Sequence, residues 1–339
     1  MMDLNSLWFG IIAFLFVGYF ILEGFDFGVG ILLPFIGKND TERRMMINAI
    51  GPHWDGNEVW LITAGGALFA AFPNWYATLF SGLYLALFVM LLALIVRGVA
   101  FEFRSKDSNP LWVKTWDWAI FIGSLLPSIL WGVAFANFIR GVPIDGNMQF
   151  TGNFWSLISF YSILGGVTSM LCFALQGALF LQLKTENPIQ DKAQSLSVKV
   201  WFFTLAALIV MVLNTYFISG IPARLGSTFN IVPLLAVIAL AGAGWFIFNK
   251  KPTQAFISNS LTILFSTVSI FTYLYPRVLI SSTDINLSLT IYNSASGSYT
   301  LTTMSWIALI FVPIMLAYQF WSYRIFKKKI APDPQSLHY

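Results

Sequence analysis

The sequence predicts an all-α, polytopic membrane protein with about nine transmembrane helices. Hydrophobic residues make up 57% of the 339 residues and charged residues only 10%, whereas about 25% of the residues in a soluble globular domain are charged. Such a chain lacks the polar side chains to cover its surface in water, so lipid must solvate much of it. Apolar runs recur along the chain, each close to the roughly 20 residues that cross a bilayer as a helix.

Nine apolar segments are long enough to cross a bilayer. In chain order they are Leu7–Phe35, Trp54–Phe72, Trp75–Phe103, Trp118–Ile139, Phe154–Leu183, Val198–Ile218, Phe229–Phe248, Phe256–Tyr275 and Met304–Phe326. Several are longer than a bilayer requires, which predicts tilted or interrupted helices. The first contains the glycine-rich run Gly24–Gly30, where we expect irregular backbone. The N-terminus lacks the basic region of a secretory signal, so we expect the first segment to be retained.

The number and order of the segments suggest an internal duplication. We expect a transmembrane domain over residues 1–326, with pseudo-repeats at 1–140 and 150–280 that each form a four-helix bundle. Segment 304–326 is then one additional helix, and residues 327–339 form a basic cytoplasmic tail. Little sequence similarity links the two halves beyond short runs of small residues.

The distribution of Lys and Arg predicts how the chain is oriented. Of the 19 basic residues, all but Arg140, Arg224 and Arg277 fall in segments on the same side as the first loop. The positive-inside rule makes that side cytoplasmic, so we expect the N-terminus outside and the C-terminus in the cytoplasm. The net charge of +4 is therefore a signal of topology, and we expect no nucleic-acid partner.

Two pairs of acidic residues lie inside the predicted spans. Glu23 and Asp26 belong to the first span, and Asp55 and Glu58 to the second. An ionised carboxylate at the bilayer centre costs roughly 2.5–3.5 kcal/mol on insertion scales, so such residues usually face the protein interior. Each pair has i,i+3 spacing and should share one helix face. The connection between the spans should bring both pairs together near the cytoplasmic side.

A cluster of this kind is typical of a proton relay, because like charges and partial burial both favour the protonated carboxyl. His53 adds an imidazole at the mouth of the cluster, with an ordinary pKa of about 6.5. Alternatively, the acids cap helices and pair with Arg97, Arg43 or Arg44, and Asp55 complements its helix dipole. Arg97 itself pairs with an acid or extends to the interface. The residue types alone leave both interpretations open.

The counts of cysteine and histidine restrict the cofactors that this chain can bind alone. It has one cysteine, Cys172, and two histidines, His53 and His338. One thiol forms neither an intrachain disulfide nor a thiolate cluster for zinc or iron–sulfur. His338 lies in the polar tail, so we expect no bis-histidine haem inside the chain alone. If the protein acts in electron transfer, a partner must hold most of the cofactors.

Several motifs resemble those of cytochrome bd oxidase subunit II. The main one is ERRMMINAIGPHWDGNEVWLITAGGALFAAFP at Glu42–Pro73, which the upstream segment Glu23–Arg44 extends. Further similar segments are Phe101–Lys106, Trp116–Asn137, Gly141–Asp145, Thr151–Trp155, Ser281–Thr290 and Thr300–Trp306. The resemblance runs in order from the first span to the ninth, which makes it specific.

The resemblance implies a subunit of a bacterial plasma-membrane complex that oxidises quinol and reduces dioxygen to water. A partner, subunit I, would carry two b-type haems and haem d, while this chain would bind none. The complex would contact lipid, and a small third subunit is left open. Subunit II would support subunit I and supply part of a cytoplasmic proton-uptake route. The matching positions are Asp55 in His-Trp-Asp-Gly-Asn, and Asp26 and Glu23 in the Gly-Phe-Asp segment.

Two positions depart from the family pattern. Glu23 stands where many members have Asp, and Glu58 where some have Gln. A rival hypothesis is a stand-alone proton-coupled secondary transporter that uses the carboxylates as its coupling site. Such a transporter would work without a partner or haem. A third hypothesis is a scaffold, in which changes to the acids affect assembly alone.

Overall fold

Helices form most of the computed structural model, which describes residues 3–218, 231–333, 335 and 337–338. The α-helices are α1 (Leu4–Ile36), α2 (Asp40–Ile50), α3 (Trp54–Ala71), α4 (Pro73–Gly82), α5 (Tyr84–Phe103), α6 (Pro110–Arg140), α7 (Phe160–Lys184), α8 (Ile189–Leu213), α10 (Val232–Phe248), α11 (Pro252–Leu274) and α12 (Ser298–Ile325). Short elements are η1 (Arg104–Lys106), η2 (Phe154–Leu157), η3 (Asn214–Ile218), η4 (Ile285–Leu287), β1 (Arg277–Leu279) and β2 (Leu289–Thr290). Arg224 lies outside the described residues, and so does Phe229, which is the first residue of the predicted seventh span.

Seven helices are long and apolar enough to cross a membrane. They are Leu4–Ile36, Tyr84–Lys106, Pro110–Arg140, Phe160–Lys184, Ile189–Phe217, Pro252–Leu274 and Ser298–Ile325. Of the other two predicted spans, α3 carries Asp55, Asn57 and Glu58 in its first turns, and α10 is an apolar helix of 17 residues. The multi-pass membrane fold is therefore confirmed, while the count of nine stays a prediction.

Two predicted spans have different helix limits in the structure. The segment Trp75–Phe103 is divided between α4 and α5, with Leu83 between them. Gly82, a poor helix former, packs closely on the ring of Phe150 at this break. The predicted span from Phe154 begins with η2, and α7 starts only after Ser159, whose side chain caps the helix. Packing at Gly82 ends α4, and the Ser159 cap begins α7. Both limits lie inside a continuous apolar run.

The glycine-rich run Gly24–Gly30 is helical throughout, so the expectation of irregular backbone was wrong. The glycines serve close helix packing instead. A Cβ on Gly28 would overlap the backbone of α7 at Phe173 and Gly177, and one on Gly30 would overlap Ser124 of α6. Small residues let transmembrane helices approach closely, and here they place the acidic segment of α1 in the centre of the molecule.

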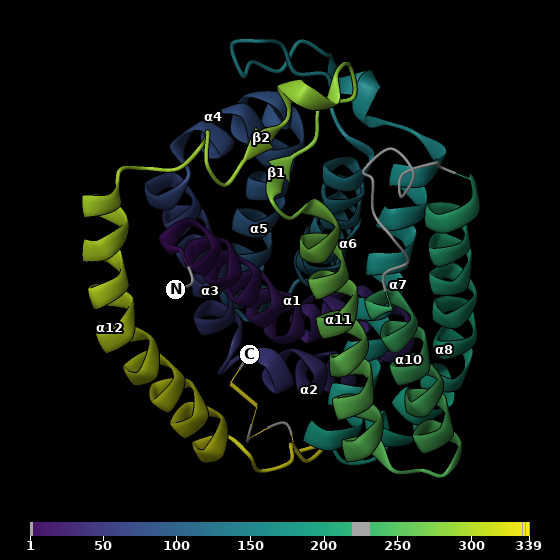
Figure 1. Cartoon of the computed structure of the whole chain (residues 1–339). Coiled ribbons are helices and arrows are strands. Elements are labelled where there is room, and N and C mark those ends of the chain that lie inside the picture. Colours follow the sequence, from purple (N-terminus) through teal and green to yellow (C-terminus); the bar gives the residue numbers. More distant parts are fainter. Residues whose placement is uncertain (1–2, 219–230, 334, 336, 339) are drawn as a thin grey trace.

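Helix α1 is the hub of the fold. It packs against α3 and α6 of the first half and against α7 and α11 of the second. One apolar core runs from Trp8 on α1 to Leu301 on α12 and includes residues from both halves. By contrast, α12 lies apart at one side (Figure 1), with most of its surface exposed. Because α1 joins the two halves, its side chains contact groups from many elements.

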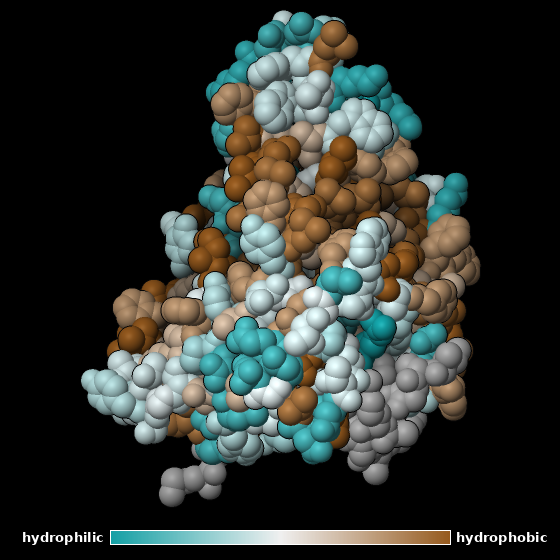
Figure 2. Space-filling model, turned by 90° about the horizontal axis from the view of Figure 1, so that it is seen from above, coloured by the Kyte–Doolittle hydropathy of each residue, from teal (hydrophilic) through white to brown (hydrophobic). Residues whose placement is uncertain are grey.

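The two ends of the molecule are closed differently. At one end β1 and β2 form a short antiparallel pair beside α4 (Figure 1), and Figure 2 shows hydrophilic patches among broad hydrophobic surfaces at this end. At the other end the predicted tail is docked onto the helices. Ile330 forms a parallel bridge with Thr185, and the carbonyl of the buried Leu337 accepts from Arg44 at 2.6 Å.

Candidate functional site

Charged side chains meet inside the first half of the molecule. Glu23 and Asp26 of α1 and Arg97 of α5 are fully buried. Arg97 Nη2 donates to Glu23 Oε1 and, at 2.6 Å, to Glu58 Oε1 of α3. Glu58 lies at the rim, with its side chain 24% exposed. One guanidinium therefore pairs with carboxylates from two helices.

The surroundings of Arg97 explain how a cation lies so deep. Its guanidinium carbon lies 4.6 Å from the ring centroid of Phe27 and 5.8 Å from that of Phe101, an arrangement that stabilises a cation. Gly123 lets α6 pack directly on the Arg97 stem. Burial of a charge is costly unless the charge is paired. The two acids and the two aromatic rings together stabilise the buried Arg97 cation.

Asp26 has a neutral partner. Its Oδ2 accepts from Asn57 Nδ2 of α3 at 2.7 Å. Asn57 is itself fully buried, and its Oδ1 accepts from Gln319 Nε2 at 3.0 Å and from Tyr323 Oη at 2.9 Å, both on α12. Asp26 is thus connected through one amide to the peripheral helix.

Several polar atoms of the cluster have no hydrogen-bond partner in the described part of the chain. They are Glu23 Oε2, Asp26 Oδ1, Arg97 Nε and Arg97 Nη1. Buried polar groups nearly always have partners. These atoms lie on Glu23, Asp26 and Arg97, the residues that the sequence singles out.

Asp55 lies away from this cluster. It is exposed on α3, and its Oδ1 accepts from the adjacent Gly56 amide at 2.7 Å. A step of three residues turns a helix by about 300°, so Asp55 is offset by roughly 60° from Glu58. Because Glu58 is already at the rim, this offset directs Asp55 outward. The structure brings Glu23, Asp26 and Glu58 together with Arg97, and leaves Asp55 on the outer face.

Two other arginines form a second network near the start of α6. Arg43 Nη1 and Arg104 Nε donate to the two oxygens of the buried Asp117 at 2.6 Å each, and Arg104 also contacts Asp40 at 2.9 Å. Arg44 reaches the tail. The structure therefore pairs Arg97 with Glu23 and Glu58, and Arg43 with Asp117.

Comparison with known proteins decides the family. The model of the cytochrome bd terminal oxidase subunit II family matches residues 4–326. The chain belongs to this family. It is 43% identical over 332 residues to cytochrome bd ubiquinol oxidase subunit 2 of Bacillus subtilis, with 98% of each chain covered. It is 37% identical over 373 residues to cytochrome bd-I ubiquinol oxidase subunit 2 of Escherichia coli K12, covering 99% of this chain and 98% of the relative.

A solved structure supports the same fold. The bd oxidase from Geobacillus thermodenitrificans aligns with a TM-score of 0.78 at 15% identity, covering 96% of this chain and 99% of that chain. The two chains therefore share their fold over nearly the whole length. None of these matches supports the transporter hypothesis.

The histidines of this subunit II family member do not fit a haem site. His53 is only 3% exposed, and its ring stacks on Tyr323 at 4.2 Å between centroids, with 2° between planes. Burial lowers the pKa of His53 to about 4, and the positive charge of Lys184 acts in the same direction. His338 is exposed in the docked tail. The described residues also include no group of three His, Cys, Asp or Glu side chains placed to hold a metal ion.

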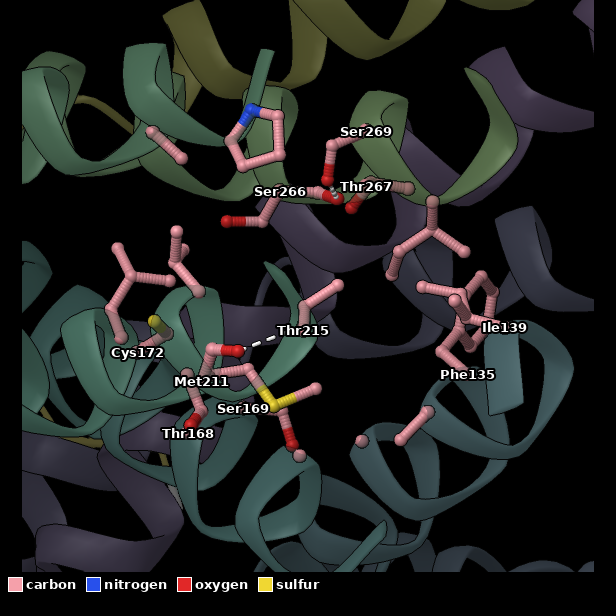
Figure 3. Close-up of a pocket in the computed structure, with 18 of the residues that line it drawn as sticks. Phe135, Ile139, Thr168, Ser169, Cys172, Met211, Thr215, Ser266, Thr267 and Ser269 are labelled. Atoms are coloured by element: carbon pink, nitrogen blue, oxygen red, sulfur yellow. Dashed lines mark hydrogen bonds between the residues drawn. The ribbon is translucent and has the colours of Figure 1, made fainter. Parts of the chain in front are cut away.

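A cavity lies between α6 of the first half and α7, α8 and α11 of the second, and the sequence did not predict it. It encloses about 150 Å³. Figure 3 shows Ser266 and Thr168 on opposite walls, with Phe135 and Ile139 to one side. The described residues that line the cavity include no histidine and no acid. This space therefore offers the sulfur atoms of Cys172 and Met211 but no imidazole for a haem. The charged cluster remains the candidate functional site.

Proposed function

We propose that this chain is subunit II of a complex that oxidises quinol and reduces dioxygen to water, and that it supplies part of the proton-uptake route. The names of the relatives, ubiquinol oxidase subunit 2, support the first part. The observation that carries the second part is the buried set of Glu23, Asp26, Glu58 and Arg97. Dioxygen reduction consumes protons, so a membrane subunit with buried carboxyl groups suits the reaction.

Charge balance selects the carboxyl that holds the proton. One guanidinium faces three carboxyl groups, and it bonds Glu23 and Glu58 directly. Asp26 contacts the Asn57 amide instead of a cation. An unpaired buried carboxylate is costly, so the group takes up a proton instead. Asp26 is therefore the residue that accepts and releases a proton, and the Arg97 pairs hold the surrounding charge fixed.

The orientation of the chain places the proton entry in the cytoplasm. Asp3 before α1 accepts from Tyr292 Oη at 3.2 Å, while Arg44, beyond the other end of α1, contacts the tail. The N-terminus and tail thus lie at opposite ends of α1. Most basic residues belong to the tail side, so by the positive-inside rule the tail is cytoplasmic and the N-terminus outside.

The partner, subunit I, docks on the face formed by α3, α5 and α12. Val59, Ile62 and Phe69 form an exposed stripe on α3, and Cβ atoms at Gly65 and Gly66 would meet open space. Such small residues let another transmembrane helix approach closely. Asp55 heads this stripe, so it lies at the boundary between subunits. From there it passes protons between the cytoplasm and the buried groups of the complex.

The haem groups lie in subunit I, as two b-type haems and haem d. The support is the poor fit within this chain, where His53 is stacked on Tyr323 and the lining of the cavity includes no histidine. When bound, these groups carry the electrons to dioxygen. This chain's residues hold and move protons at the Asp26 and Asp55 carboxyl oxygens, with the Glu23–Arg97 pair beside Asp26.

Purification from the native membrane through a tag on this chain tests the proposal. A reduced-minus-oxidised visible spectrum should show b and d haem bands together with a second polypeptide, and quinol should drive oxygen consumption. A haem-free single chain that moves protons across vesicles, after dissociation has been excluded by crosslinking before extraction, would contradict the proposal and support a transporter.

A further inference from the structure

Asn57 uses all of its hydrogen-bonding capacity. Its Nδ2 donates to Asp26 at 2.7 Å and to the Leu22 carbonyl at 3.5 Å. Its Oδ1 accepts from Gln319 and Tyr323 of α12 at 3.0 and 2.9 Å. An amide offers two donors and two acceptor positions, so one buried side chain connects α1, α3 and α12.

The contacts with α12 and with the Leu22 carbonyl together set which way the Asn57 amide faces. Gln319 and Tyr323 donate to its oxygen, while the Leu22 carbonyl, which can only accept, and Asp26 accept from its NH2 group. In this orientation the amide stabilises the Asp26 carboxylate. A rotated amide would direct its oxygen at Asp26, where it repels the carboxylate but accepts from the protonated acid. The orientation of Asn57 thus decides which protonation state of Asp26 is favoured.

Helix α12 has few other attachments in the described part of the chain. Near its start Trp8 Nε1 donates to the Leu301 carbonyl and to Ser305 Oγ, at 3.1 Å each. Near its end, besides Gln319 and Tyr323, the stacking of His53 on Tyr323 holds the ring in place. The surface between these ends is largely exposed. A small tilt of α12 would therefore act mainly on the Asn57 contacts.

We propose that Asn57 is a positioning residue, and that Gln319 and Tyr323 of α12 hold its amide so that Asp26 accepts and releases protons. The inference rests on the proposed role of Asp26 in proton uptake. Helix α12 then controls proton transfer, although its own side chains do not carry the proton. The charged groups around Asp26 are Glu23 on α1, Glu58 on α3 and Arg97 on α5, and α12 adds only the Tyr323 hydroxyl.

The test uses the complete complex with the double substitution Gln319→Leu and Tyr323→Phe. Phe keeps the ring on His53 and removes only the hydroxyl. Oxygen consumption per haem should fall several-fold, its H/D solvent isotope effect should rise, and the midpoint of its pH profile should shift by about one unit. Tyr323→Phe alone, with Gln319 still donating, should retain most of the activity. Tyr161→Phe is the matched control, because it also removes a buried tyrosine hydroxyl, one that bonds Thr215 away from the charged cluster.

A mutant cycle separates this inference from the function on which it rests. In an Asp26→Asn background the α12 substitutions should cause no further loss. Normal turnover of Asp26→Asn alone would overturn the proposed function. The positioning role alone would be overturned in either of two cases. In the first, Asp26→Asn slows oxygen consumption but the α12 double variant does not. In the second, the losses of activity add in the combined variant. If the double variant does not assemble, Gln319→Met combined with Tyr323→Phe, which keeps the length of both side chains, is judged by the same criteria with and without Asp26→Asn.

Discussion

The two halves of the molecule bury polar groups of different kinds. In the first half, Glu23 and Arg97 are charged and fully buried. In the second half, two fully buried polar side chains, Gln176 and Asn259, are neutral. There Asn259 Nδ2 donates to Gln176 Oε1 at 2.7 Å, and Gln176 Nε2 donates to Ser260 at 2.7 Å. Neutral amides join α7 to α11, whereas charges join α1, α3 and α5.

This difference supports the proposal that the first half carries the proton chemistry. Interhelical hydrogen bonds between neutral groups hold membrane helices together at modest free energy and leave no net charge. Three ionised carboxyl groups around one guanidinium leave two negative charges in excess, which favours the uptake of protons by the cluster. Burying charged groups costs more free energy than burying hydrogen-bonded neutral amides, which supports the proposal that the charged arrangement serves a function.

The largest expected effect is on folding and comes from Arg97→Met. Removing the cation leaves the buried Glu23 without a partner and also frees Glu58 at the rim, and an unpaired buried charge costs about 3–5 kcal/mol. We expect little assembled complex and a large fall in the melting temperature measured by intrinsic fluorescence. Gln176→Leu in the second half should cost only about 0.6–1.7 kcal/mol. Equal destabilisation by the two substitutions would remove the distinction between the halves.

The next effect is on turnover and comes from Asp55→Asn. The carboxylate is exposed in this chain, so its loss should leave the subunit folded and the complex assembled. Oxygen consumption should slow by roughly tenfold or more, as for loss of a group that transfers protons. Asp107→Asn, on the exposed connection before α6, is the control. Unchanged turnover in an assembled Asp55→Asn complex would exclude Asp55 from the route.

A smaller effect concerns stability and pH. The pKa of His53 in the folded protein is about 4, below its ordinary 6.5. Between these values the unfolded chain binds the proton and the folded one does not, so stability falls as the pH drops from about 6.5 to about 4. His53→Gln should make the melting temperature less dependent on pH over this range. An identical dependence in both proteins would show that His53 is protonated when folded.

The smallest expected effect is that of His53→Gln on activity between pH 6 and 8. His53 is neutral over this range, and its ring contacts Tyr323 instead of a carboxyl group. The pH profile of oxygen consumption should therefore keep its midpoint. A displaced midpoint would restore His53 to the proton route, as the sequence suggested.

Sequence patterns predicted the features that depend on neighbours along the chain. Apolar runs located the seven long helices, and intramembrane acids indicated Glu23, Asp26 and Glu58. They did not predict Asn57 as the partner of Asp26, because its own partners Gln319 and Tyr323 lie more than 250 residues away. Nor did spacing alone show that Asp55 faces outward, since that depends on how α3 is rotated against α1.

The most direct test of the account is oxygen consumption per haem by the assembled complex with Asp26→Asn, compared with Asn259→Leu. Asp26 is the charged-region group proposed to hold the proton, and Asn259 is its neutral counterpart in the second half. We expect turnover to fall at least tenfold in Asp26→Asn and to remain near the wild-type rate in Asn259→Leu, with the haem spectrum unchanged in both. Normal turnover in an assembled Asp26→Asn complex would contradict the proposal that the first half conducts protons through this carboxyl.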